Sequence, residues 1–200
     1  MSSFAVQYCA MKRKYEFKRR AERLNETRNR IIESTVELHT SVGPAHTTIS
    51  AIAERAGVQR HTVYSHFRSE AELFDACSAH WTAHHPFPDA TAWRAIEDPE
   101  QRLRAALGAV YEWYETVGHD LDVFRRDGRI HATTASLVAK REARLLELRD
   151  ELVDGWPRRK AVRAALAHAL ELETWDSLVR RHGLSRQQAV DAMLRFVASV

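Results

Sequence analysis

The sequence predicts an all-α protein with an N-terminal three-helix domain and a larger helical C-terminal domain. Two observations carry this prediction. Apolar residues recur at helical spacing along most of the 200-residue chain. No segment alternates polar and apolar residues with the period of two that is typical of a β-strand. We divide the chain into an extension (1–24), an N-terminal domain (25–80) and a C-terminal domain (81–200).

The first three helices are predicted from their ends. Residues 1–24 have no convincing apolar stripe, so we expect disorder or a frayed helix there. Asn25 can cap the first helix, which continues over 30–41 and ends at Val42-Gly43-Pro44. A second helix over 48–56 can be capped by a threonine hydroxyl and is stopped by Gly57. A third helix follows over 60–66.

Later helices are predicted from glycine, proline and capping signals. Ser69 caps a fourth helix that runs to about His84 and carries Leu73, Phe74, Cys77 and Trp81 on one face. Five more helices are expected at 98–118, with Gly118 closing the first of them, and at 121–126, 132–152, 158–181 and 185–197. The helix over 132–152 should direct five residues inward: Leu137, Val138, Leu145, Leu148 and Leu152.

The second and third helices, joined by a turn that contains Gly57, form a helix-turn-helix pattern. Ala53 is small enough to let two helices cross closely. The outward face of the third helix carries only side chains that can hydrogen-bond to a base edge or a phosphate: Gln59, Arg60, His61, Thr62, Tyr64, Ser65 and His66. This face predicts a DNA-reading unit; a merely solvated polar face is the alternative.

About fifty residues here resemble the tetracycline-repressor-like (TetR) regulators. The matching positions are Thr48, Ile52-Ala53, Ala56-Gly57-Val58, Thr62-Val63-Tyr64 and Phe67, flanked by 31–43 and 72–74. The resemblance implies a fourth helix that links the two domains and carries an induction signal. His39 departs from the pattern, because a large aromatic residue usually packs there. Glu70 replaces a lysine that commonly approaches a phosphate.

Individual roles follow from side-chain chemistry. Arg60 can reach guanine O6 and N7, and Gln59 can read adenine or support the backbone. His61 either reads a base or restricts the fit. We expect phosphate contacts from four residues: Thr48, Thr62, Tyr64 and His66.

Charge is distributed unevenly along the chain. Residues 1–30 carry a net charge of +6, whereas the other 170 residues carry −3. A basic arm of this kind either neutralises DNA phosphates or is simply a solvated tail.

The strongest alternative site in the sequence is a metal site, which would suit a metal-sensing regulator. Cys77, His80 and His84, with His85 beside them, have spacings that can place three ligands along one helix face. Cys77 also suits a small core position, so we expect no metal and no cofactor. We find no nucleophile–base pair, glycine-rich phosphate loop or paired carboxylates, so we expect no enzyme activity on the C-terminal domain.

The C-terminal domain is expected to bind an unidentified small-molecule effector. Its aromatic residues can line an apolar site, although each alone is more readily explained as core. The candidate ligand-binding residues are Trp81, Tyr111, Tyr114, Phe124 and Trp175. Alanines on the last two helices allow close helix packing, and the resemblance implies a homodimer formed there.

The sequence therefore predicts a homodimeric transcriptional regulator that binds a palindromic DNA operator, with repression relieved by a ligand. An activator or DNA organiser without an inducer is the alternative. No apolar run is long enough to span a bilayer, no signal peptide is evident, and two distant cysteines form no framework. We therefore expect a cytoplasmic protein that does not contact membranes.

Overall fold

The structure is helical throughout. This computed structural model describes the backbone of residues 3–200 and the side chains of residue 16 and of residues 18–200. No strand occurs in that range, so the all-α prediction is confirmed. None of the helices described there has the length and apolar character needed to cross a membrane. The chain divides into two units, residues 1–42 with 46–81, and residues 43–45 with 82–200.

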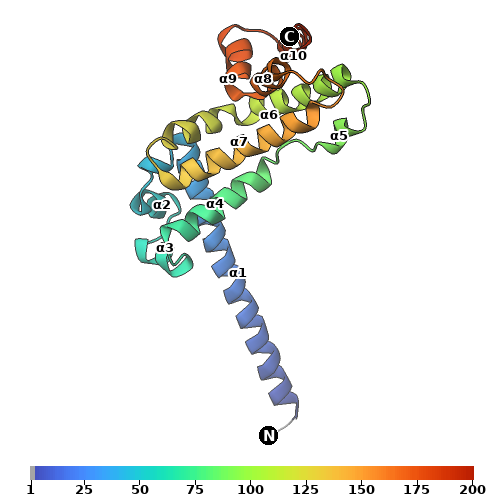
Figure 1. The fold of residues 1–200 in the computed structure, drawn as a ribbon. Coiled ribbons are helices and arrows are strands. Elements are labelled where there is room, and N and C mark those ends of the chain that lie inside the picture. The colour runs from blue at the N-terminus through green and yellow to red at the C-terminus, as the bar shows by residue number, and fades with distance from the viewer. Residues whose placement is uncertain (1–2) are drawn as a thin grey trace. The chain divides into compact units, whose positions relative to one another are not determined.

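The N-terminal unit is built from the first four helices (Figure 1). They are α1 (Ser3–Ser41), α2 (Ile49–Arg55), α3 (Arg60–His66) and α4 (Glu70–His84), whose last residues belong to the other unit; the short 3-10 turn η1 (Pro44–His46) precedes α2. The core combines buried apolar side chains from all four helices: Ile31, Ile32, Ile49, Ile52, Ala53, Ala56, Val63, Phe67, Leu73 and Cys77.

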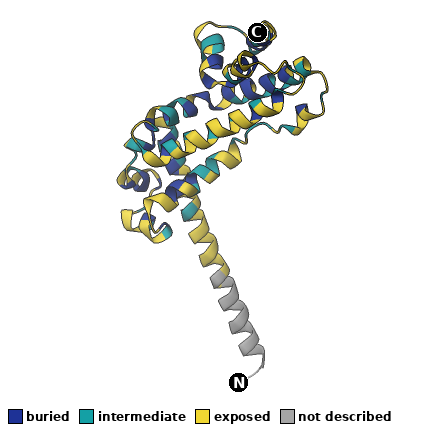
Figure 2. Cartoon of the chain, in the orientation of Figure 1, coloured by how far each residue is buried: buried dark blue, intermediate teal, exposed yellow. Residues whose placement is uncertain are grey.

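Helix α1 is longer than predicted. It begins at Ser3, so the expected start at Asn25 is wrong. Residues 18–26 are exposed on every side of the helix (Figure 2), so burial does not hold this stretch in place. Its arginine, lysine, glutamate, alanine and leucine residues are good helix formers, and Lys18 pairs with Glu22 one turn later at 3.9 Å. The disorder or fraying expected at residues 1 and 2 lies outside the described residues.

The C-terminal unit is organised around its longest helix. Its elements are α5 (Thr91–Arg94), α6 (Pro99–Asp127), α7 (Ala132–Leu152), α8 (Lys160–Leu170), α9 (Leu172–Trp175), the π-helical turn η2 (Asp176–Arg181) and α10 (Arg186–Ala198). Helix α6 packs against α7 and α10, and both of these pack against α8. One face of α6 is entirely buried at helical spacing: Leu103, Ala106, Leu107, Val110, Tyr111, Tyr114 and Val117.

The predicted break at Gly118 is wrong, because α6 continues through it to Asp127. Gly118 is buried, and a β-carbon there would lie 2.7 Å and 2.9 Å from two ring carbons of Trp175. The glycine therefore permits a close approach between α6 and the Trp175 indole. Nothing at this position requires the helix to end.

The single helix predicted over 158–181 is also wrong, because the chain turns at Glu171 with an extended backbone. Side-chain hydroxyls donate the hydrogen bonds that the backbone of a continuing helix would otherwise have donated. The Tyr111 hydroxyl donates to the Ala169 carbonyl at 2.8 Å, and the Tyr114 hydroxyl donates to Leu170 at 2.7 Å. These bonds satisfy two carbonyls that a helix end otherwise leaves without partners.

Helix α7 has the bounds that the sequence predicts, but its inward face is shifted. Leu137 is 37% exposed, which contradicts its predicted core position. The buried and half-buried positions follow a seven-residue repeat: Thr134, Val138, Arg141, Leu145, Leu148 and Leu152. An arginine therefore stands in the inward stripe of α7.

The last residue of α6 holds the loop 43–45. Asp127 is completely buried, and its carboxylate accepts the Ala45 backbone N–H at 2.9 Å. Gly43 has φ +103°, and a β-carbon on it would collide with the Asp127 carboxylate. Only glycine suits both the backbone angle and the space.

Candidate nucleic-acid interface

The turn between α2 and α3 is closed by backbone hydrogen bonds. The Thr48 hydroxyl caps α2 by accepting the Ala51 N–H at 3.2 Å, as its N-cap role predicts. At the other end, Val58 N–H donates to Ala53 at 2.9 Å and Gly57 N–H donates to Glu54 at 3.1 Å. This is a Schellman motif, and Gly57 supplies its positive φ of +64°.

Helix α3 is fixed to the unit by its apolar side. Val63 and Phe67 are each 1% exposed, and Phe67 N–H donates to the Val63 carbonyl at 2.9 Å. The guanidinium of Arg28 on α1 lies 4.7 Å from the centre of the Phe67 ring, a cation–π contact. The orientation of α3 is thus set by buried contacts at its C-terminal end.

The opposite side of α3 faces solvent. Gln59, Arg60, His61 and Tyr64 are exposed, and Thr62 and His66 are half-buried. Tyr64 keeps 46% of its surface exposed although it is a large aromatic residue. The structure therefore places all the residues predicted to contact DNA on α3 and at the cap of α2. Their individual roles stay predictions.

Polar contacts on the neighbouring helices α1, α2 and α4 stabilise the unit that carries this interface. Glu37 on α1 pairs with Arg55 at the end of α2. The Ser69 hydroxyl accepts the Glu72 N–H at 3.1 Å, while the Glu72 carboxylate accepts the Arg68 N–H at 2.8 Å. Ser69 thus caps α4, and Glu72 holds the residue that precedes this cap.

His39 occupies the space expected for a large aromatic residue. It is 9% exposed, its ring centre lies 5.5 Å from that of Phe74, and its Nδ1 lies 3.4 Å from the Cys77 sulfur. Burial raises the pKa of the Cys77 thiol to about 12, so the thiol stays neutral. Among the described residues, no group of three or more His, Cys, Asp or Glu side chains is arranged to hold a metal. The geometry thus gives the metal alternative no support.

Three of the five candidate ligand-binding residues lie together. Tyr111, Tyr114 and Trp175 come together in the C-terminal unit, with ring centres 6.4 Å and 5.8 Å from that of Tyr114. Burial raises the pKa of both tyrosines, whose hydroxyls are already bonded to α8 carbonyls. Trp81 belongs to the N-terminal unit, and Phe124 is half-buried on α6. Their role in binding a ligand stays a prediction.

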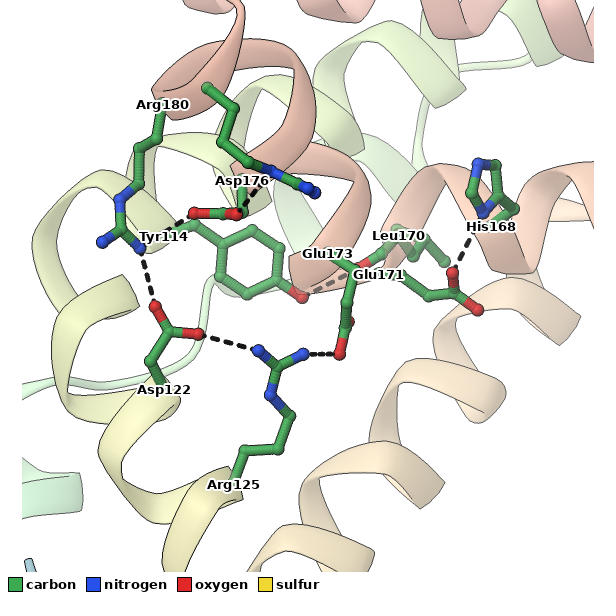
Figure 3. A network of polar contacts seen from close by, with 10 residues as sticks. Tyr114, Asp122, Arg125, His168, Leu170, Glu171, Glu173, Asp176 and Arg180 are labelled. Carbon is green, nitrogen blue, oxygen red and sulfur yellow. Dashed lines mark hydrogen bonds and ion pairs between the residues drawn. The ribbon is translucent and has the colours of Figure 1, made fainter.

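A network of ion pairs lies beside Tyr114 (Figure 3). Asp122 contacts Arg125 at 3.1 Å and Arg180 at 2.7 Å, Arg180 also contacts Asp176 at 3.0 Å, and Arg125 pairs with Glu173. The sequence analysis missed this network and also Arg141, which the seven-residue repeat of α7 could have revealed. No sequence signal marked Asp127.

The alanines of α8 and α10 divide between interior and surface. Ala165, Ala169 and Ala189 are buried in the unit, so interior packing accounts for them. Others remain on the surface: Ala161, Ala164 and Ala198. Phe196 on α10 is 40% exposed, and its ring meets that of His168 on α8 edge-on, with 6.1 Å between the ring centres.

Known proteins resemble the chain most clearly over the helix-turn-helix. Residues 31–77 match the model of a family described as bacterial regulatory proteins, tetR family. The regulator TtgR of Pseudomonas putida is 43% identical over 70 residues, which cover 34% of this chain and 33% of TtgR. The transcriptional activator FasR of Mycolicibacterium smegmatis is 32% identical over 109 residues, 54% of this chain and 48% of FasR. The chain thus spans a third to a half of the curated relatives it matches.

Solved structures extend the likeness of fold to most of the chain. A TetR-like transcriptional regulator from a Rhodococcus species superposes with a TM-score of 0.63 at 19% identity, over 86% of this chain and 93% of the other. The fatty acid degradation regulator FadR from Bacillus halodurans gives 0.60 at 15% identity, over 86% and 94%. Residues 31–77 are thus a helix-turn-helix domain of the tetR family of bacterial regulatory proteins, and most of the chain has the fold of TetR-like regulators.

Proposed function

We propose that the protein is a homodimeric transcriptional regulator that binds a palindromic DNA operator through α3 and represses transcription until a small molecule releases it. The observation that carries this proposal is the exposed face of α3. Seven hydrogen-bonding side chains, from Gln59 to His66, are exposed or half-buried on this face, while Val63 and Phe67 anchor the helix from within. A helix held in this way is suited to entering the major groove.

Base and phosphate contacts divide along this face. Arg60 stands at the start of α3, where its guanidinium can donate two hydrogen bonds to guanine. The Thr48 oxygen already accepts from the α2 backbone, so its hydroxyl hydrogen is left to donate to a phosphate. Thr62, Tyr64 and His66 would position the helix by further phosphate contacts, whereas Gln59 and His61 would face bases.

Dimerisation gives the recognition helix enough sequence to read, because one short helix contacts only a few base pairs. The exposed alanines of α8 and α10 and the exposed Phe196 beside His168 support an interface on these helices. Phe196→Glu would place a charge on this surface. We expect the variant to elute as a monomer in size-exclusion chromatography with light scattering, at a concentration where the wild type is dimeric. A wild type that is monomeric at operator-binding concentrations would contradict the dimer.

Release by a ligand requires two states with different operator affinity. The effector would bind in the C-terminal unit and favour the state whose two recognition helices are wrongly spaced for the operator. The affinity for DNA would then fall by at most the factor by which the ligand binds that state more tightly than the DNA-binding state.

The experiment compares Arg60→Ala with Arg129→Ala by fluorescence anisotropy on a labelled operator. Arg129 is exposed in the turn after α6, so its substitution removes the same charge from the C-terminal unit. We expect Arg60→Ala to weaken binding by about 5- to 150-fold and to relax one base position, as for the loss of a bidentate guanine contact. Equal affinities for wild type and Arg60→Ala would refute the assignment of α3 as the reading helix.

Activation is the second candidate for the sign of regulation, because the relative FasR is named as an activator. A reporter gene placed behind the operator distinguishes the two. Repression predicts higher reporter expression when the regulator is deleted, and activation predicts lower expression.

A further inference from the structure

Arg141 is a charged residue on the inward face of α7. It follows Thr134 and Val138 and precedes Leu145 and Leu148 in the buried repeat of this helix. Its Nε atom is buried and has no hydrogen-bond acceptor among the described residues. Burial lowers the pKa of the guanidinium, which shows how poorly its charge is solvated. A leucine would suit this position better for stability alone.

Neighbouring arginines do not share this situation. Arg125 and Arg180 are both bonded to Asp122, and each has a second carboxylate partner in Glu173 or Asp176 (Figure 3). The C-terminal unit therefore pairs the arginines around Tyr114 with carboxylates, and none of these ion pairs includes Arg141. Arg141 is half-buried, and Asp122 and Glu142 act on its charge without forming an ion pair with it. Its buried Nε still lacks an acceptor, which an anionic ligand would supply.

A second buried donor lacks an acceptor beside the same tyrosine. Trp175 is 3% exposed, its ring centre lies 5.8 Å from that of Tyr114, and its Nε1 has no partner among the described residues. Burial raises the pKa of Tyr114, and the positive charge of Arg141 acts in the opposite direction. The Tyr114 hydroxyl hydrogen is already donated to Leu170. Arg141 Nε and Trp175 Nε1 are thus both buried donors without acceptors, and a carboxylate at Arg141 would accept from its Nε.

We propose that the effector of this regulator is an organic monocarboxylate whose carboxylate binds Arg141 and whose apolar part contacts the half-buried side chains of Val138 and Leu145 on the same face of α7. One guanidinium matches one negative charge, whereas a phosphate monoester carries nearly two at neutral pH. The apolar side chains on either side of Arg141 along α7 favour an apolar body over a polar one. This inference rests on the proposed function, because it names the ligand class of the proposed effector site.

Thermal denaturation of the full chain with matched pairs of probes tests the proposal. The probes are phenylacetate, indole-3-acetate, octanoate and decanoate, each compared with its uncharged amide, and phenyl phosphate as a dianion. Isothermal titration then gives Kd for each probe that raises the Tm. We expect at least one carboxylate to stabilise the wild type while its amide does not.

Variants distinguish a bound carboxylate from a general salt effect. Arg141→Gln removes the charge, and we expect it to weaken carboxylate binding about ten- to hundredfold, as for loss of a charge-assisted hydrogen bond. Lys140→Gln removes a neighbouring exposed charge and should leave the response as in wild type. No stabilising carboxylate, an equal effect of the amide, a response to phenyl phosphate alone, or unchanged binding in Arg141→Gln would each overturn the proposal.

Operator binding by the same wild-type preparation distinguishes a failure of the carboxylate proposal from a failure of the proposed DNA-binding function. A protein that binds its operator but shows no Arg141-dependent carboxylate binding refutes this inference and leaves the DNA-binding function standing. A protein that binds a carboxylate through Arg141 but selects no DNA sequence refutes the proposed function instead.

Discussion

Two glycines in α6 give opposite predictions for the same substitution. Gly108 and Gly118 lie ten residues apart in one helix. A β-carbon on Gly108 would meet no atom within 4 Å, whereas one on Gly118 would lie 2.7 Å from the Trp175 ring. Both positions gain helix propensity on substitution by alanine, by about 0.5–1 kcal/mol. The difference between the variants therefore reports the contact with Trp175.

The cost at Gly118 comes from a ring that has little freedom to move. Trp175 is 3% exposed and packs against Tyr114, whose hydroxyl is bonded to the end of α8. Overpacking of a filled core costs about 1–3 kcal/mol, which exceeds the gain in propensity. We expect Gly118→Ala to destabilise by about 1–2 kcal/mol net, after the propensity gain is subtracted. For a chain of this size, that corresponds to a fall in Tm of about 2–8 °C.

Thermal unfolding followed by circular dichroism, at one fixed protein concentration, measures both variants. The Gly108→Ala variant should have a Tm about 1–4 °C above wild type. Equal stabilisation by both substitutions would refute the close approach of α6 and Trp175. Destabilisation by Gly108→Ala would contradict a continuous α6.

Three further perturbations test other parts of the structure. Gly57→Ala must adopt φ +64°, so we expect a loss of about 1–2 kcal/mol in urea unfolding; unchanged stability would contradict the Schellman turn. Asp127→Ala leaves the Ala45 N–H without its acceptor and should lower the free energy of unfolding by about 1–3 kcal/mol. Asp120→Ala, at a half-buried site on the same helix, is the comparison. Equal losses of stability in the two variants would contradict the special role of Asp127. Burial raises the pKa of the Cys77 thiol from 9.0 to about 12 in the folded state. The thiol of the unfolded chain therefore ionises at lower pH, and the free energy of unfolding falls as the pH rises from about 9 to 12. Cys77→Ala should lack this alkaline loss in urea titrations, and an identical pH profile for both proteins would contradict it.

Local signals predicted the recognition unit well. The bounds of α3 and α7, the cap at Thr48 and the turn at Gly57 follow from capping, glycine conformation and apolar spacing within a few residues. These interactions are local, so the sequence contains them directly.

The errors arose where distant residues decide the outcome. Gly118 resembles a helix end in sequence, but it accommodates Trp175, which lies more than fifty residues later. The turn at Glu171 is stabilised by hydroxyls of Tyr111 and Tyr114 on another helix. Arg141 looks like a surface residue in the sequence, but the folded chain half-buries it on the inward face of α7. Helix propensity and spacing contain no information about such partners.

The central claim, that α3 reads a palindromic operator as part of a dimer, is tested most directly by selecting bound sequences from a random duplex pool at physiological salt. Wild type and Arg60→Ala are compared in parallel. The account predicts one palindrome for the wild type, with half-sites whose centres lie about 10 base pairs or a multiple apart, and loss of one symmetric base preference in Arg60→Ala. Recovery of no consensus from the wild type, or of the same consensus from both proteins, would contradict it.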